Sequence, residues 1–356
     1  MELNGEGGKA TTYCVTGASG YIGSWLVNSL LERGYTVHAT LRDLAKSQYF
    51  QFKWKRNERL RLFQADLQDE GSFDEAVKGC HGVFHVAASM EFDISPDHVN
   101  LESYVQSKVI DPAMKGVRNV LGSCLKSNSV KRAVFTSSIS TLTAKDENER
   151  WRSVVDETCK TPIDHVLKTK ASGWVYVLSK LVSEEEAFRY AKEKGMDLVS
   201  VITTTVSGPF LTPSLPSSLQ VLLSPITVLV LGDSKLFAIL SAVNKRMGSI
   251  GLVHIEDICM AHLFLMEEPK AEGQYICCVD NIDMHELILK HFSKEHLCKV
   301  HKVDLEESQS LMKPMISSKK LRDLGFEYEY SIDEIIRQTI DASIDFRFPT
   351  LDHKLK

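Results

Sequence analysis

Several features that mark secreted, metal-binding and membrane proteins are missing from this sequence of 356 residues. Its eight cysteines are scattered without a CxxC pair, which suits neither a disulfide framework nor a zinc site. We therefore expect no bound metal. The first residues lack a basic segment followed by an apolar one, so we expect no signal peptide. Together these absences predict a reducing compartment, and we expect the protein to be cytoplasmic.

Long apolar runs and an excess of basic charge are missing too. The most apolar stretch, Leu219–Leu231, contains Ser224, Pro225 and Thr227 and is shorter than the ~20 residues that a membrane-spanning helix needs. A net charge of −5 gives no reason to expect nucleic acid. With 43% hydrophobic and 25% charged residues, the composition is typical of a globular domain. We expect neither a membrane nor a nucleic acid as partner, and a chain that is a monomer or a weak homodimer.

Short β-branched runs alternate with longer amphipathic segments along the first 207 residues. Six strands separated by helices predict a parallel sheet that is buried on both faces. With right-handed crossovers, this pattern predicts an α/β, doubly wound fold of the Rossmann type. The strands are expected at 11–17, 35–41, 60–67, 81–89, 131–138 and 196–204. The main helices are expected at 21–34, about 98–127 and about 170–194.

The regular alternation ends where a segment rich in proline and serine begins. We predict a Rossmann domain over 9–207, to which a further strand near 272–280 returns. A smaller C-terminal region, made of 208–271 and 281–350, is expected to bind the substrate. Within that region, helices around a glycine turn are expected at 317–344.

Three glycines, Gly17, Gly20 and Gly23, lie between the first expected strand and the first expected helix. In "TGASGYIG" the missing side chains let the backbone turn tightly and approach a pyrophosphate, to which the helix N-terminus offers N–H groups. The spacing is GxxGxxG, one residue longer than the common GxGxxG, and a compact turn without a ligand is the alternative. The position at the first strand-to-helix junction favours a dinucleotide site, which Tyr21 and Ile22 are also expected to contact.

The second expected strand is followed by Arg42, at the position that reads the adenosine ribose of a dinucleotide. An arginine can pair with the 2′-phosphate of NADP, whereas an acidic residue favours the free hydroxyl of NAD. Arg42 therefore predicts NADP(H), although the adjacent Asp43 leaves NAD open. Lys46 either adds a second positive charge or is an exposed helix lysine. Asp66 either accepts a hydrogen bond from the adenine amino group or caps a helix, and Leu67 is expected to contact the cofactor beside it.

Tyr176 and Lys180, in "YVLSK", are four residues apart and lie on one face of a helix. A tyrosine is a poor acid at neutral pH, and we expect the lysine ammonium to lower its pKa and make it a proton donor to a forming alkoxide. "FTSS" ends the preceding strand, so Ser137 or Ser138 lies at the carboxyl edge of the sheet, where it can hydrogen-bond a substrate carbonyl. Each motif alone is common, but their order along the chain predicts a site for hydride transfer to a small molecule.

The motifs "TGASGYIGSWL", "TLRD", "FTSSIS", "YVLSK" and "GPFLTPSLPSSL" resemble the plant dihydroflavonol reductase branch of the extended short-chain dehydrogenases/reductases. "LVHIEDICMAHLFLME", "GQYICC" and "SSKKLRDLGFEYEYSIDEI" are most similar to anthocyanidin reductases. The resemblance runs from about residue 9 to 343. It implies an NADPH-dependent oxidoreductase that reduces a carbonyl or an oxidised ring carbon of a plant flavonoid or related phenolic.

By motif position, the resemblance implies that Ser138, Tyr176 and Lys180 are catalytic, with the tyrosine as proton donor and the lysine as its activator. Besides the glycines and Arg42, it implies cofactor contacts from Tyr176, Lys180, Val86, Ala87, Ala88, Thr203 and Ser218. The implied substrate contacts are Ser138, Ser89 and Thr143.

The chain departs from the family pattern at three places. Thr203 stands where the family usually has proline, which changes the expected nicotinamide pocket. Thr143 stands where dihydroflavonol reductases usually carry asparagine or aspartate, which argues against an ordinary dihydroflavonol reductase. Val228–Leu231 looks like an insertion, either an apolar flap over the substrate or a surface loop.

Other functions remain open from the sequence. A sugar-nucleotide epimerase or dehydratase shares GxxGxxG and YxxxK, although the C-terminal resemblance argues against it. A reductase of non-flavonoid ketones or aldehydes would use the same catalytic residues. An NADPH-binding redox sensor without turnover is the alternative from another class, and the presence of the serine, the tyrosine and the lysine argues against it.

Overall fold

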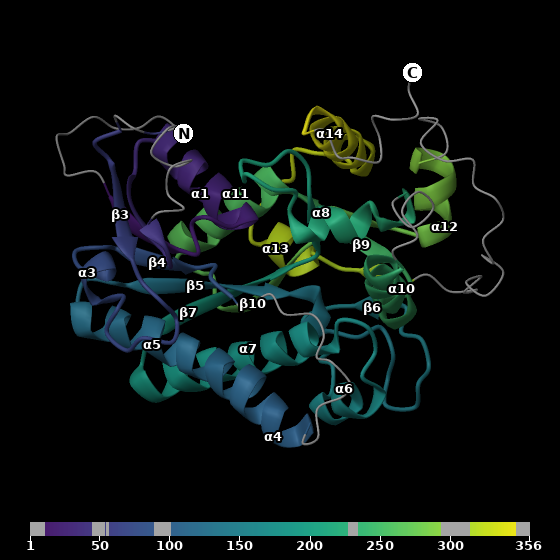
Figure 1. Ribbon diagram of the computed structural model, residues 1–356, viewed down its shortest axis with the longest axis horizontal. Helices are drawn as coiled ribbons and strands as arrows, with labels where there is room; N and C mark the ends of the chain where they lie inside the picture. The colour runs from purple at the N-terminus through teal and green to yellow at the C-terminus, as the bar shows by residue number, and fades with distance from the viewer. Residues whose placement is uncertain are drawn as a thin grey trace.

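Seven strands form one parallel sheet in the computed structural model, which describes residues 11–44, 54, 57–88, 101–226, 234–292 and 314–346 (Figure 1). Their order is β10-β7-β5-β4-β1-β2-β3, and every neighbouring pair is parallel. The strands are β1 Thr12–Thr16, β2 Thr36–Leu41, β3 Leu60–Gln64, β4 Gly82–His85, β5 Arg132–Ser138, β7 Asp197–Thr203 and β10 Gly273–Cys277. The predicted doubly wound sheet is therefore confirmed.

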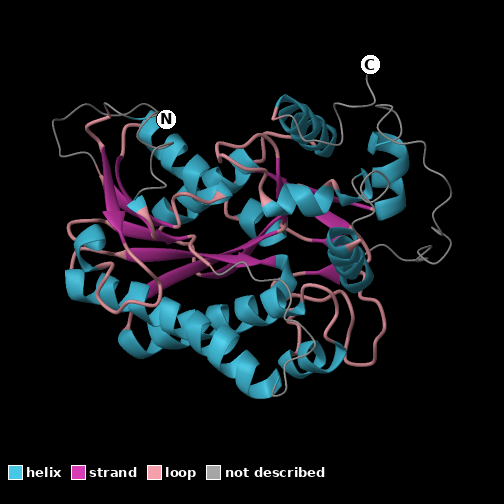
Figure 2. Ribbon diagram, viewed as in Figure 1, coloured by secondary structure: helices cyan, strands magenta, loops and turns pink. Residues whose placement is uncertain are grey.

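Helices cover both faces of this sheet (Figure 2). Successive side chains of a strand point to opposite faces, so each buried strand serves two cores. In β5, Val134 lies in the core beneath α1 and α11, while its neighbours Ala133 and Phe135 lie in the core formed with α5 and α7. The covering helices are α1 Tyr21–Glu32, α11 Ile255–Glu267, α3 Asp74–Val77, α5 Asp111–Ser127 and α7 Trp174–Lys194.

The chain reverses its direction across the sheet at β1. From β1 it continues to β2 and β3 on one side, and β4 then lies on the other side of β1. Doubly wound folds bind ligands in the crevice that opens at the carboxyl ends of two such strands. The glycine loop follows β1 and residues 86–88 follow β4, so the topology brings these two predicted cofactor segments to one place.

Two expected helices differ in detail from the prediction. The helix expected at about 98–127 consists of α4 (Leu101–Val105), a π-helical turn (Gln106–Ile110) and α5, and residues 98–100 lie outside the described part of the chain. Proline lacks an N–H and its ring crowds the carbonyl four residues earlier, which explains the wider turn before Pro112. The helix expected from 170 begins at Trp174, because Gly173 is left-handed with φ +81°.

A second hydrophobic core lies in the C-terminal part of the chain. It includes Leu240, Leu252 and Ile340, and it is built on a three-stranded sheet of order β11-β9-β8. These strands have three to five residues, too few for a clear sequence signal. The elements of this part are β8 Thr205–Ser207, α8 Ser217–Leu222, α10 Lys235–Met247, β9 Ile250–His254, β11 Asp280–Ile282, α12 Met284–Glu286, a π-helical turn Leu287–Phe292, α13 Lys319–Asp323 and α14 Ile332–Asp345. Elsewhere, β6 Val154–Val155 pairs with β12 Met315–Ile316, and η3 Ile139–Thr141 and α6 Ile163–Thr169 precede α7.

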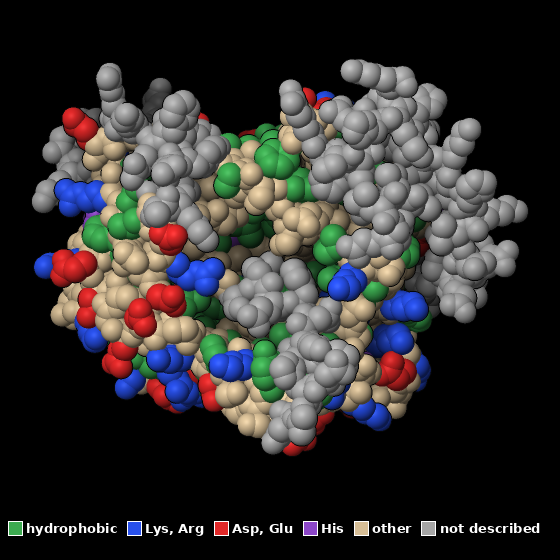
Figure 3. Space-filling model, in the orientation of Figure 1, with side chains coloured by type: hydrophobic (Ala, Val, Ile, Leu, Met, Phe, Trp, Pro, Cys, Tyr) green, Lys and Arg blue, Asp and Glu red, His purple; other side chains and the backbone are tan. Residues whose placement is uncertain are grey.

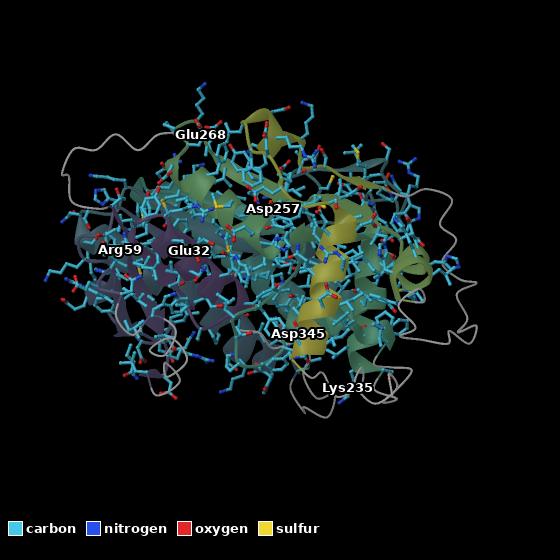
Figure 4. The ribbon with its side chains drawn as sticks, turned by 90° about the horizontal axis from the view of Figure 1, so that it is seen from above. Glu32, Arg59, Lys235, Asp257, Glu268 and Asp345 are labelled. Carbon is cyan, nitrogen blue, oxygen red and sulfur yellow. The ribbon has the colours of Figure 1, made fainter. Side chains whose placement is uncertain are left out.

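A buried carboxyl group joins α11 to the segment before α14. Asp257 is buried, and its Oδ1 accepts a hydrogen bond from the Glu329 N–H at 2.9 Å; Figure 4 labels this residue in the view from above. Burial raises the pKa of Asp257 to about 6. The expected glycine turn is Gly325, with φ +110°, between α13 and α14. Among the described helices, none combines the length and the hydropathy of a membrane span.

Candidate functional site

The glycine loop is packed so closely that it has no room for side chains. A Cβ atom on Gly17 would lie 2.8 Å from Ala87 Cα, and one on Gly23 would lie 2.3 Å from the Gly17 carbonyl oxygen. Gly17 also has φ +66°, which favours glycine. Helix α1 starts after Gly20 without a side-chain cap, so its first N–H groups are not used by a capping side chain. The loop and helix start thus fit a dinucleotide pyrophosphate.

Thr16 and His85 connect the carboxyl ends of β1 and β4. Thr16 Oγ1 accepts the N–H groups of Val86 and Ala87, both at 3.1 Å, and lies 3.0 Å from His85 Nδ1. Because two amides donate to this oxygen, the hydroxyl proton is left to bond Nδ1, and the ring proton lies on Nε2. Burial and the charge of Lys180 lower the pKa of His85 to about 3, so the ring is neutral. This pair holds residues 86 and 87 against the glycine loop.

The predicted adenosine-side residues follow β2 and β3. Arg42 comes directly after β2 with an exposed side chain, and its carbonyl oxygen accepts from Gln64 Nε2 at 3.2 Å. Asp66 Oδ1 accepts the Gln68 N–H at 2.8 Å in a local turn. The alternative that Asp66 caps a helix is wrong, since α3 follows Phe73. Lys46, Ser89 and Val228–Leu231 lie outside the described residues.

A pocket lies between the ends of the strands and helices α5 and α7. Its lining includes Leu67, Ala87, Ala88 and Lys180, four residues that the sequence assigned to the cofactor. They come from three separate segments, those after β3 and β4 and helix α7, so the fold brings these predicted residues together. Figure 3 shows that the face in view is hollowed near its middle, with hydrophobic side chains beside the hollow.

Ser138, Tyr176 and Lys180 converge at the carboxyl end of β5. Ser138 is the last residue of that strand, its Oγ accepts the Ser140 N–H at 3.2 Å, and a side-chain hydrogen bond joins it to Tyr176. Lys180 is 6% exposed, and its Nζ donates to the Thr136 carbonyl oxygen at 3.0 Å. Of the two serines that the sequence left open, Ser138 is the one that forms a hydrogen bond with the tyrosine.

The charges at this site differ from the sequence-based expectation. Burial raises the pKa of Tyr176, and the hydrogen bond with Ser138 and the charge of Arg246 partly offset that effect. The expectation that the pKa of Tyr176 is lowered is wrong for this structure, because burial outweighs the groups that lower it, and the Lys180 ammonium donates to the Thr136 carbonyl oxygen. A raised pKa keeps the phenol protonated at neutral pH, which is the form that can donate a proton.

Glu184 is a buried carboxylate that the sequence reading did not single out. It lies one helical turn beyond Lys180, is 5% exposed, and accepts from Ser200 Oγ at 2.6 Å. Burial lowers the pKa of Lys180 to about 8, and the charge of Glu184 opposes that change. The i, i+4 spacing of a lysine and a glutamate was the available signal.

Three residues that were predicted to contact the cofactor or the substrate, Thr203, Thr143 and Ser218, lie near β5 and β8. Thr203 stands beside Ser138 in the β5–β7 register, and its Oγ1 donates to the Ser137 carbonyl oxygen at 3.2 Å. Thr143 follows η3 and its Oγ1 accepts the Lys145 N–H at 3.3 Å. Ser218 Oγ donates to the Val206 carbonyl oxygen at 2.8 Å.

The two α1 residues expected near the cofactor, Tyr21 and Ile22, contact later parts of the chain. Tyr21 donates from its hydroxyl to the Gly208 carbonyl oxygen at 3.0 Å, and the Ile22 carbonyl oxygen accepts from the Cys259 thiol at 3.8 Å. These contacts fix the segment after β8 and helix α11 to the start of α1. They therefore help to position the glycine loop.

Comparisons with known proteins agree with this geometry. Residues 13–278 match the model of the NAD dependent epimerase/dehydratase family. The chain is 41% identical over 337 residues to a putative anthocyanidin reductase of Ginkgo biloba, covering 94% of each chain. It is 40% identical over 342 residues to a bifunctional dihydroflavonol 4-reductase/flavanone 4-reductase of Malus domestica, covering 94% of this chain and 91% of that one.

A solved structure is similar over the same length. Vestitone reductase from alfalfa (Medicago sativa) superimposes with a TM-score of 0.74 at 29% identity, covering 94% of this chain and 98% of that chain. The resemblance that the sequence motifs indicated is confirmed by these matches. The chain belongs to the NAD-dependent epimerase/dehydratase family and, within it, to the reductases that include dihydroflavonol 4-reductase and anthocyanidin reductase.

Proposed function

We propose that this protein is an NADPH-dependent reductase that acts on a carbonyl or an oxidised ring carbon of a flavonoid or a related plant phenolic. The observation that carries the proposal is the convergence of Ser138, Tyr176 and Lys180 beside the glycine loop in one doubly wound fold. The relatives at about 40% identity, named as reductases of dihydroflavonols, flavanones and anthocyanidins, support the substrate class.

The residues present fit NADPH at the carboxyl edge of the sheet. The close packing at Gly17 and Gly23 supports a phosphate-binding role for this loop. Arg42 is exposed after β2, where a guanidinium can pair with a 2′-phosphate. Val86, Ala87 and Ala88 follow β4 on the other side of the crevice. The bound dinucleotide supplies the hydride that reduces the substrate.

Tyr176 is the proton donor in this proposal. Its phenol is protonated at neutral pH, since the ordinary tyrosine pKa is near 10 and burial raises it further. Ser138 hydrogen-bonds the tyrosine and can also bond a substrate oxygen at the strand end, which fixes the direction of proton transfer. Lys180 places a buried positive charge next to this site, where negative charge develops on the substrate oxygen.

We further propose that 208–271 and 281–350 form the substrate-binding region. The Ala144 N–H donates to the Arg246 carbonyl oxygen at 3.3 Å, which brings α10 of that region beside the segment that follows Ser138. We propose a cytoplasmic location, since the seven cysteines among the described residues are all free thiols. We propose a monomer or weak homodimer, which sedimentation over a range of concentrations would test.

The test is to follow NADPH oxidation with a panel of anthocyanidins, dihydroflavonols, flavanones, and simple ketones and aldehydes. We expect turnover with at least one flavonoid and none with Tyr176→Phe, while both proteins bind NADPH. A protein that binds NADPH but oxidises it with no compound would support the redox-sensor alternative. Turnover confined to simple ketones or aldehydes would overturn the substrate class, and a preference for NADH would overturn the role of Arg42.

A further inference from the structure

Two serines close to Ser138 in sequence and two arginines whose backbones bond Ala144 carry buried polar atoms that lack a hydrogen-bond partner. Among the described residues they include Ser137 Oγ, Ser140 Oγ, Arg152 Nε and Arg246 Nε. Folded proteins pair nearly all such atoms, so each exception needs a physical explanation. Ser137 directly precedes Ser138, and Ser140 follows it by two residues.

The backbone fixes where both arginines stand. Ala144 donates its N–H to the Arg246 carbonyl oxygen at 3.3 Å and accepts the Arg152 N–H at 2.8 Å. Arg246 comes from α10 and Arg152 from the loop before β6, so two separate segments place the backbone of an arginine beside the chain that leaves Ser138. Among the described residues, neither side chain forms an ion pair with a carboxylate.

The charges of the two arginines affect the pKa values of different groups. Arg152 lowers the pKa of Asp156, so a carboxylate stands within its electrostatic reach. Arg246 acts on Tyr176, and burial lowers the pKa of its guanidinium to about 10. Arg246 is half-buried and its Nε is buried without a hydrogen-bond partner, so a negative group that completes its hydrogen bonds would be favoured. Arg246 is therefore the stronger candidate for a ligand contact.

We propose that Arg246 binds a negatively charged oxygen of the substrate and holds the reducible carbon beside Tyr176. The inference rests on the proposed function and names a property of its substrate: an acidic oxygen, either an ionised phenol or enol, or a carboxylate. A guanidinium offers five donors in a planar fork, which suits such an oxygen and orients the molecule that carries it. The cofactor phosphates do not compete for this group, because the glycine loop and Arg42 follow β1 and β2, whereas Ser138 ends β5.

The test measures binding without turnover, so that it does not depend on finding the physiological substrate. Quercetin serves as a phenolate probe, phenylglyoxylate as a carboxylate probe, and acetophenone as an uncharged aryl ketone. Titration calorimetry gives the affinity of each for the complex with NADP⁺, and the quercetin absorption band reports whether its phenol is ionised when bound. The variants are Arg246→Met, Arg246→Lys and, as a control on the exposed face of the same helix, Lys245→Met.

We expect the wild-type protein to bind at least one anionic probe and Arg246→Met to bind it about tenfold more weakly or worse, the loss of a hydrogen bond to a charged group. Arg246→Lys should recover part of the affinity, and Lys245→Met all of it. Which probe responds distinguishes a phenolate from a carboxylate. If the phenolate is the ligand, bound quercetin should be ionised at a lower pH in the wild type than in Arg246→Met.

Three results would overturn the inference. They are a failure of the wild type to bind either anion, equal affinity of wild type and Arg246→Met for both anions, and an equal loss of acetophenone binding, which indicates a structural role. The NADPH oxidation panel is a separate readout. If the wild-type protein turns over no flavonoid but still binds an anion through Arg246, the proposed function is rejected and the anion site is supported.

Discussion

The buried ammonium of Lys180 imposes a cost on the folded state that its removal should reveal. Burial lowers its pKa from 10.5 to about 8, with Glu184 opposing that change. At roughly 1.4 kcal/mol per pKa unit, the difference corresponds to about 3 kcal/mol. Because the pKa of this cation is lower in the folded state, the cost is fully present below about pH 8 and fades as the pH rises toward 10.5.

Lys180→Met removes the charge and keeps the length of the side chain. It also removes the hydrogen bond to the Thr136 carbonyl oxygen, at a cost of about 1 kcal/mol. We therefore expect the free energy of unfolding to increase by about 2 kcal/mol at pH 7. Near pH 9.5 most of this gain should disappear, since the unfolded lysine then holds its proton while the folded one has largely lost it. Reductase activity should be lost at both pH values.

Urea unfolding of the cofactor-free proteins, followed by tryptophan fluorescence at pH 7 and pH 9.5, measures these differences. Lys192→Met, at an exposed position of the same helix, is the matched control and should change the unfolding midpoint little at either pH. If Lys180→Met unfolds at lower urea than the wild type at pH 7, or if its gain is the same at both pH values, the assigned cost is refuted.

Three further changes test the structure around the site. Gly23→Ala places a Cβ 2.3 Å from the Gly17 carbonyl oxygen, so the glycine loop must shift. We expect the NADPH affinity, measured by fluorescence titration, to fall about tenfold or more, and an unchanged affinity would contradict the role of this loop. Glu184→Gln removes the charge that raises the pKa of Lys180, so the alkaline limb of the kcat/KM profile should move to lower pH. Arg132→Met leaves three carbonyl oxygens between the end of α11 and β10 without their donor. We expect the free energy of unfolding, measured with urea, to fall by about 2 to 4 kcal/mol. An unchanged free energy of unfolding would show that these bonds contribute little.

Most of the main sheet could be predicted from sequence because its central strands are buried on both faces. Such strands form short runs of mostly apolar residues, and β5 and β7 stand out for this reason. The short strands of the second sheet could not be predicted, since three residues of β8 or β11 carry no periodic signal. The late start of α7 depends on the left-handed Gly173, and a glycine in sequence does not reveal its φ.

The three residues proposed as catalytic could be selected from the sequence, because the proposed chemistry needs fixed residue types in a fixed order. Ser138, Tyr176 and Lys180 all lie where the motifs placed them, at the carboxyl end of β5. The sign of the Tyr176 pKa change was not predictable, since burial dominates it and burial is a property of the fold. Arg246 was missed for a related reason, because its effect on the tyrosine arises from the packing of α10 and no motif marks it.

The central claim is that this chain delivers a hydride to carbon and the Tyr176 proton to oxygen. The most direct measurement uses NADPH carrying deuterium at both C4 positions, with mass spectrometry of the product of the preferred flavonoid substrate. The account predicts one deuterium at the reduced carbon with the wild type, and no product with Tyr176→Phe despite unchanged NADPH affinity. A product without deuterium at that carbon, or full activity of Tyr176→Phe, would contradict it.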